Sequence, residues 1–104
     1  MAFSSTRRRY ASFNTVQSLP GPLIDFFWYL IDNNLKGTIT LSNVLNFELL
    51  DNKADLSIRF TQDDMPEFSA VFDTSFSFNP DWPRLFHAVD NMGRETIITA
   101  DEMM

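Results

Sequence analysis

The sequence predicts an α+β fold in which one main helix packs on an antiparallel β-sheet built from hairpins. Two observations indicate it. A strongly apolar segment at residues 19–32 has helical spacing, and two later pairs of segments alternate apolar and polar residues. Strand and helix patterns do not alternate along the chain, as they would in a parallel sheet. With 104 residues, 44% hydrophobic and 21% charged, the chain has the size and composition of one globular domain.

The helix is predicted over residues ~21–36. Its core, LPGPLIDFFWYLID, cannot span a membrane, because charged residues interrupt it and a span needs about 20 apolar residues. Prolines suit its first turn, and Gly37 ends it after Lys36. Its polar residues fall on one narrow stripe, namely Asp25, Tyr29, Asp32, Asn33 and Lys36.

The apolar arc of this helix is wider than the ~100° of an ordinary surface helix. The helix is therefore either nearly engulfed by its own domain, which we favour, or also meets a partner. In the first case Phe27 and Trp28 should be largely buried.

Two hairpins are expected after the helix. VLNFELLD and ADLSIRFTQ flank the polar turn Asp51-Asn52-Lys53, and RLFHAVD and ETIITAD flank a turn that ends in Gly93. In the first hairpin the inward residues should be Leu45, Phe47, Leu49, Leu56, Ile58 and Phe60.

Three further segments carry weaker patterns. RYASFNTV, residues 9–16, and FSAVF, residues 68–72, are predicted to be strands. FDTSFSFNPDWP, residues 72–83, is predicted to be irregular, with Phe76, Phe78 and Trp82 anchored on the core.

Charge divides the chain into a flexible basic arm, residues 1–8, and a single domain, residues 9–104. Arg7, Arg8 and Arg9 could form an arm that contacts phosphates, although we favour a solvated terminus. From Tyr10 onward there are 14 acidic and 5 basic residues, a net charge of −9. Such a body disfavours direct nucleic-acid binding, because its charge repels phosphates, and it favours basic protein partners.

The acidic side chains that fall in turns are the candidate partner-binding residues, together with one exposed tyrosine of the helix. Because turns at one end of a small sheet converge, we expect part of this charge to gather into one acidic surface. The candidates are Asp51, Asp55, Asp63, Asp64, Glu67, Asp81, Asp90 and Tyr29.

No pattern in the sequence indicates a catalytic, metal or cofactor site, so we expect none and no enzymatic activity. His87, the only histidine, lies in phase with Leu85 and Val89 in a strand pattern, as a half-buried structural residue would. Residues 51–62 resemble a calcium loop only in part, since they lack its glycine and its final glutamate. The chain has no cysteine and no signal-peptide pattern, so a cytoplasmic location is expected.

Short segments in a fixed order resemble a family of small uncharacterised bacterial proteins, domain of unknown function 960. The segments span most of the chain from residue 9 on: Arg9-Tyr10, Leu19-Pro20, Phe27-Trp28, Ile31-Asp32, Phe47-Glu48-Leu49, Pro66-Glu67-Phe68, Val89-Asp90, Gly93, Thr96 and Ala100-Asp101-Glu102. The resemblance implies a protein of low-GC Gram-positive bacteria and their mobile elements, and it implies no activity or site residues.

Two classes of function follow. The first is a non-enzymatic, acidic protein-binding or regulatory module, for which the mobile-element resemblance suggests a counter-defence inhibitor, of anti-CRISPR or antirestriction type, acting on a basic nucleic-acid-handling protein. The alternatives are a small enzyme that uses surface carboxylates and a structural homodimer. A carboxylate with a perturbed pKa in a cleft would favour an enzyme, and a convex acidic or apolar face would favour a binding protein.

Overall fold

The computed structural model describes residues 2–3 and 8–103. Its elements follow one another as β1 (Arg9–Ala11), α1 (Phe13–Ser18), α2 (Gly21–Leu30), the π-helical turn η1 (Ile31–Leu35), β2 (Val44–Asn52), β3 (Asp55–Thr61), β4 (Ser69–Ser77), β5 (Leu85–Asn91), β6 (Arg94–Thr99) and the 3₁₀ helix η2 (Ala100–Met103).

The strands form one mixed sheet of six strands in the order β1-β6-β5-β2-β3-β4. All neighbours are antiparallel except β1 and β6, which run parallel. The predicted α+β class is confirmed, but the purely antiparallel sheet is wrong, because β1 pairs with the last strand of the chain. The hairpins β2–β3 and β5–β6 form as predicted, and the central pairing of β2 with β5 joins them without being a hairpin.

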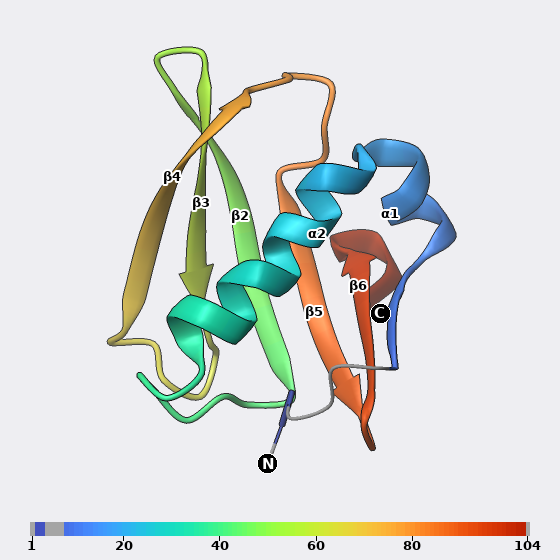
Figure 1. The fold of residues 1–104 in the computed structure, drawn as a ribbon, viewed down its shortest axis with the longest axis vertical. Coiled ribbons are helices and arrows are strands. Elements are labelled where there is room, and N and C mark those ends of the chain that lie inside the picture. The colour runs from blue at the N-terminus through green and yellow to red at the C-terminus, as the bar shows by residue number, and fades with distance from the viewer. Residues whose placement is uncertain (1, 4–7, 104) are drawn as a thin grey trace.

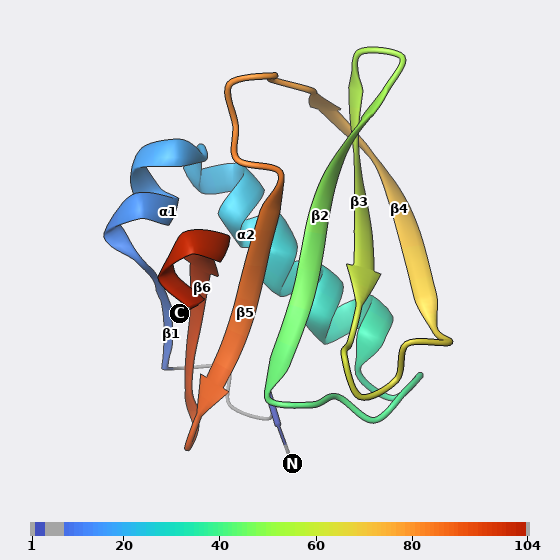
Figure 2. The same cartoon turned by 180° about the vertical axis from the view of Figure 1, so that it is seen from behind.

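One face of the sheet is covered by α2, which crosses it diagonally (Figure 1). With η1 it forms the predicted helix, ending at Leu35, and Gly37 follows with a φ of +81° that suits glycine. The view from behind shows the other face, on which no helix lies over β2, β3 and β5 (Figure 2).

The core lies between α2 and the sheet. Phe27 meets Phe47 with ring centroids 5.1 Å apart, and Phe47 meets Phe60 at 5.7 Å. Every inward residue predicted for the first hairpin is buried, which confirms its register: Leu45, Phe47, Leu49, Leu56, Ile58 and Phe60.

The expected burial of Phe27 is confirmed, and that of Trp28 is confirmed in part, because Trp28 is partly buried against the core. Trp28 is half-buried at the edge of the helix, with the Arg9 guanidinium 5.0 Å from the centre of its ring. The side of the helix that sequence analysis assigned to the core thus also carries a cation–π contact with β1.

Two weaker predictions are wrong in part. Of residues 9–16, only Arg9–Ala11 is a strand, because Ser12 caps α1 by accepting a hydrogen bond from the Thr15 N–H. Residues 73–77 are not irregular, since β4 continues to Ser77. The three predicted aromatic anchors are confirmed, being partly buried against the core: Phe76, Phe78 and Trp82.

In the predicted arm, Arg7 lies outside the described residues, as do residues 4–6. Phe3 is fully buried, and its N–H donates to Asp90 Oδ2 at 2.7 Å. The described start of the chain therefore packs on the domain. In the part of the chain that the structure describes, no helix is long and apolar enough to cross a membrane.

Candidate functional site

Six of the predicted acidic residues fall into two groups at opposite ends of the sheet. The first acidic flank, defined as Asp63, Asp64 and Glu67, lies in the connection from β3 to β4. The second acidic flank, defined as Asp51, Asp55 and Asp81, lies at the ends of β2 and β3 beside their turn and in the β4–β5 connection, at the other end of β4 (Figure 1). All six side chains are exposed, so the structure holds two acidic surfaces joined by β4.

The first flank carries the stronger charge, because no basic residue lies between Gln62 and Phe68. Asp63 is held in place by Asn46, whose Nδ2 donates to Asp63 Oδ1 at 2.9 Å. Asn46 Oδ1 in turn lies 2.8 Å from Nδ1 of His87. The first flank is therefore continuous with polar side chains on the uncovered face of the sheet.

His87 is half-buried on that face, as sequence analysis predicted. Burial lowers its pKa, and the nearby Asp63 carboxylate opposes this effect. Its Nδ1 contact is to the Asn46 amide rather than to a nucleophile, so its surroundings are those of a structural histidine.

The second flank is built around a tight turn. Lys53 and Ala54 both have positive φ, 53° and 74°, which is typical of a type I′ hairpin turn. Asp51 Oδ1 accepts the Ala54 N–H at 3.0 Å. The Phe78 N–H donates to the Ala54 carbonyl at 2.8 Å, which ties the β4–β5 connection to this turn. Lys53 and Arg84 lie in these segments, so the net charge here is lower than at the first flank.

The expectation that Asp90 is an exposed turn residue is wrong. Asp90 is buried at 8% exposure, where its Oδ2 accepts the Phe3 N–H and its Oδ1 accepts the Gly93 N–H at 2.8 Å. It therefore closes the β5–β6 turn and fastens the start of the chain, and it is not available to a partner.

Tyr29 is exposed on α2, at 55%, and stacks on Phe26 with ring centroids 5.9 Å apart. It lies on the polar stripe that the helical spacing predicted. The helix thus offers an aromatic contact surface that is separate from both acidic flanks.

Apolar side chains are also exposed on the uncovered sheet face. Val71 of β4 is 55% exposed, Tyr10 of β1 is 43% exposed and Leu85 of β5 is 37% exposed. They lie on different strands and alternate with polar residues, so this face combines apolar and polar contacts.

A charged network that sequence analysis missed joins β1, η1 and β6. The Arg9 guanidinium donates to both oxygens of Asp32, at 2.7 and 2.6 Å, and to Oε1 of Glu95 at 3.1 Å. Lys36 Nζ lies 3.0 Å from Asp32. The hydrogen bonds from Arg9 lower the pKa of Asp32, whereas burial raises the pKa of Glu95. The spacing of Asp32 and Lys36, four residues apart on a helix, could have indicated their pair, but no local spacing signals the contacts of Arg9.

Glu95 has a perturbed pKa but lies in no accessible cleft. Its side chain is fully buried, and its Oε2 has no hydrogen-bond partner among the described residues. A substrate could not reach this carboxylate, so its environment is that of a structural group.

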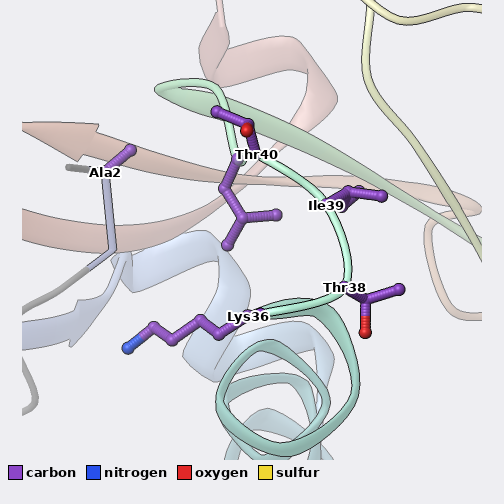
Figure 3. A pocket seen from close by; sticks show the side chains of 7 residues that line it. Ala2, Lys36, Thr38, Ile39 and Thr40 are labelled. Carbon is purple, nitrogen blue, oxygen red and sulfur yellow. The ribbon is translucent and has the colours of Figure 1, made fainter.

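A hollow of about 530 Å³ lies beside this network, lined by Ala2 and by residues 36–41. Lys36 and Ala2 lie on one side of the loop, and Thr38 and Ile39 point to the other (Figure 3). Among the described residues that line it, Lys36 supplies the one charged group, and that ammonium already pairs with Asp32. Within the described residues, no group of three or more His, Cys, Asp or Glu side chains could hold a metal ion.

Two comparisons with known proteins identify relatives of this chain. Residues 8–102 match the sequence profile of a family described as staphylococcal protein of unknown function, DUF960. The crystal structure of a protein of unknown function from Enterococcus faecalis is similar over 100% of this chain and 97% of that one, with 40% identity and a TM-score of 0.95. Comparison with curated proteins finds no match.

Proposed function

We propose that this chain, which belongs to the DUF960 family of staphylococcal proteins of unknown function, is a non-enzymatic binding module that docks a basic protein partner through its acidic flanks. The observation that carries the proposal is the first acidic flank. Its three carboxylates are exposed, no basic residue lies between Gln62 and Phe68, and the flank adjoins the uncovered sheet face.

The negative charge of the flanks indicates that the partner surface is basic. Exposed carboxylates steer a basic surface into contact and add mainly to the association rate. Nucleic-acid-handling proteins carry such basic channels. We infer that the partner belongs to this class and that the module acts by occupying the channel, as a counter-defence inhibitor of anti-CRISPR or antirestriction type would.

The test begins with affinity capture from the native host and identification of the captured protein by mass spectrometry. Binding of the purified partner is then measured across a salt titration. Affinity should fall as salt rises, since exposed charges are screened within ~8 Å at physiological ionic strength.

Charge reversal locates the surface. Asp64→Lys with Glu67→Lys should weaken binding roughly 5–30-fold, because each rim charge contributes up to about 1 kcal/mol. The matched control, Asp25→Lys with Asp101→Lys, makes the same change in net charge at exposed positions outside both flanks and should leave affinity within about twofold.

One pattern of results would reject the acidic surface. Binding that ignores salt, survives the Asp64 and Glu67 reversals and is lost in Tyr29→Ala would place the partner on α2. A second copy of the chain could then be that partner, and sedimentation analysis of the Tyr29→Ala variant would show the loss of a dimer.

A further inference from the structure

β4 is a long strand at the edge of the sheet. It spans Ser69–Ser77 and has a hydrogen-bonded neighbour, β3, on one side, because it is last in the strand order. Its sequence, SAVFDTSFS, contains no proline or lysine, the residues with which proteins commonly block an edge. An unblocked edge is a template for a further strand.

The usable part of this edge is its first half. Five consecutive residue pairs, from Thr61↔Ser69 to Ser57↔Asp73, form a regular antiparallel ladder between β3 and β4. Beyond Asp73 the register shifts, and the Phe76 N–H bonds locally to the Thr74 hydroxyl at 3.1 Å. The regular half is the half next to the first acidic flank.

The type I′ turn fixes which backbone groups of β4 point outward. Across such a two-residue turn, the flanking pair Asn52↔Asp55 exchanges hydrogen bonds. Bonding then alternates along β3, so Asp55, Ser57, Arg59 and Thr61 bond toward β2.

The intervening residues of β3 bond toward β4, through the pairs Ile58↔Phe72 and Phe60↔Ala70. Ser69, Val71 and Asp73 consequently direct their N–H and C=O groups away from the sheet. Their side chains are exposed as well. This half of the edge therefore offers both backbone partners and accessible side chains.

Charge selects the occupant of the edge. Asp63, Asp64 and Glu67 lie at the Ser69 end, and Asp73 lies at the other end of the regular ladder. An extended segment with basic residues at the end that reaches the first flank matches this layout. A second copy of the chain does not match it. Antiparallel pairing of two β4 strands would place the first acidic flank of each copy beside the Asp73 end of the other, where the charge is also negative.

We propose that β4 accepts an extended segment of the basic partner as a seventh, antiparallel strand along Ser69–Asp73, with Lys or Arg residues at the carboxyl end of that segment facing the first acidic flank. This inference rests on the proposed function, for which it names the mode of docking. About five residues of the partner would pair, a length of roughly 17 Å at the usual rise of a strand.

The test uses synthetic peptides and the uniformly ¹⁵N-labelled full chain. The probe is Thr-Val-Thr-Val-Thr-Lys-Lys, in which alternating residues favour a strand and the lysines lie at the carboxyl end. The control is Thr-Pro-Thr-Pro-Thr-Lys-Lys, which has the same charge but cannot pair as a strand. NMR titration gives the affinity, and amide hydrogen exchange reports on the outward N–H groups.

The probe should bind at least about tenfold more tightly than the proline control and slow exchange of the Val71 and Asp73 amides about tenfold or more. Val71→Pro removes an outward N–H without removing a bond to β3, so it should abolish the preference for the probe. Val71→Thr keeps that N–H and should preserve the preference for the probe over the proline control. Circular dichroism checks that both variants are folded, and the peptide comparison does not depend on either variant.

Equal binding of the two peptides, with no protection of Val71 or Asp73, would overturn the strand-pairing inference and leave electrostatic docking in place. The strand-pairing inference would also be overturned if neither peptide bound while the captured partner still bound in a salt-dependent way. Binding of the captured partner that ignores salt and survives the Asp64 and Glu67 reversals is the separate result that rejects the proposed function.

Discussion

Arg9 and Glu95 lie opposite each other in the one parallel pairing of the described sheet, with Arg9 Nε 3.1 Å from Glu95 Oε1. Glu95 is fully buried, and the other side of the same guanidinium binds Asp32. Arg9 therefore pairs with two carboxylates, of which Asp32 also pairs with Lys36. The pKa values of the two carboxylates move in opposite directions, because Glu95 is buried and Asp32 is well hydrogen-bonded.

Removal of Arg9 should be costly. Arg9→Met leaves Glu95 buried without its partner, and such changes typically cost about 3–5 kcal/mol of unfolding free energy. Glu95→Gln, which cannot ionise, should be close to neutral at pH 7 and should recover part of the loss when combined with Arg9→Met. Urea unfolding of the four proteins checks the prediction, and an Arg9→Met loss that is unchanged by Glu95→Gln would contradict it.

Stability should depend on pH in two opposite ways at this network. The pKa of Glu95 is raised on folding, so its contribution is present below the unfolded pKa of about 4.5 and is lost as pH rises through the folded value. The pKa of Asp32 is lowered, so its contribution is present above about pH 4 and is lost as pH falls through the folded value. Unfolding from pH 3 to 7 should therefore show a steeper acid loss for Glu95→Gln, and a shallower one for Asp32→Asn, than for the unmodified chain.

Neighbouring aromatic residues of α2 should differ in their contributions. Phe27→Ala should lower the unfolding free energy by about 3–5 kcal/mol, the usual cost of a cavity at a buried aromatic residue. Trp28→Ala should lower the unfolding free energy by less, roughly 1–3 kcal/mol, because Trp28 is only partly buried. The variant loses that partial burial and the cation–π contact with Arg9. Tyr29→Ala serves as the exposed control, with a change near 0.5 kcal/mol or less. Equal losses at Phe27 and Trp28 would contradict the burial pattern.

The two hairpin turns should respond in opposite directions to exchanges between glycine and alanine. Gly93 has a φ of +89° and open space where a Cβ would stand, so Gly93→Ala adds backbone strain alone, about 1–2 kcal/mol. Ala54 already bears a positive φ of 74°, and Ala54→Gly should stabilise by roughly 0.5–1 kcal/mol once the entropy of glycine in the unfolded chain is included. Thermal unfolding of both variants gives the signs.

His87 should titrate below its ordinary value of about 6.5, as followed by its ring proton shifts in NMR. Asp63→Asn should lower this pKa further, because the Asp63 carboxylate opposes the effect of burial. A histidine pKa that is depressed in the folded state destabilises the protein as pH falls below the unfolded value, so His87→Gln should flatten that part of the stability profile. A rise in the His87 pKa on Asp63→Asn would contradict the assignment.

Local patterns were enough to predict the elements whose partners are near in sequence. The alternation in β2 and β3 gave the register that buries Phe47 and Ile58, and Gly37 marked the end of the helix. These features depend on period and turn chemistry, which are written in consecutive residues.

Features that depend on distant residues could not be predicted in this way. The pattern of residues 9–16 predicts a longer strand than β1, and nothing near Arg9 shows that it pairs with Glu95. Asp90 reads as an exposed turn acid until Phe3 is seen to donate to it. Exposure of the other six acids followed from their turns, but their division between two ends required the strand order.

The pairing of β1 with β6 also bears on how the chain is made in the cell. Arg9 and Glu95 are 86 residues apart. At a ribosomal rate of about 5–20 residues per second, roughly 4–17 s separates the synthesis of the two. During that interval Phe3, which is fully buried in the finished domain, has no completed core to enter. The pairing of β1 can therefore be completed only after β6 has left the ribosome.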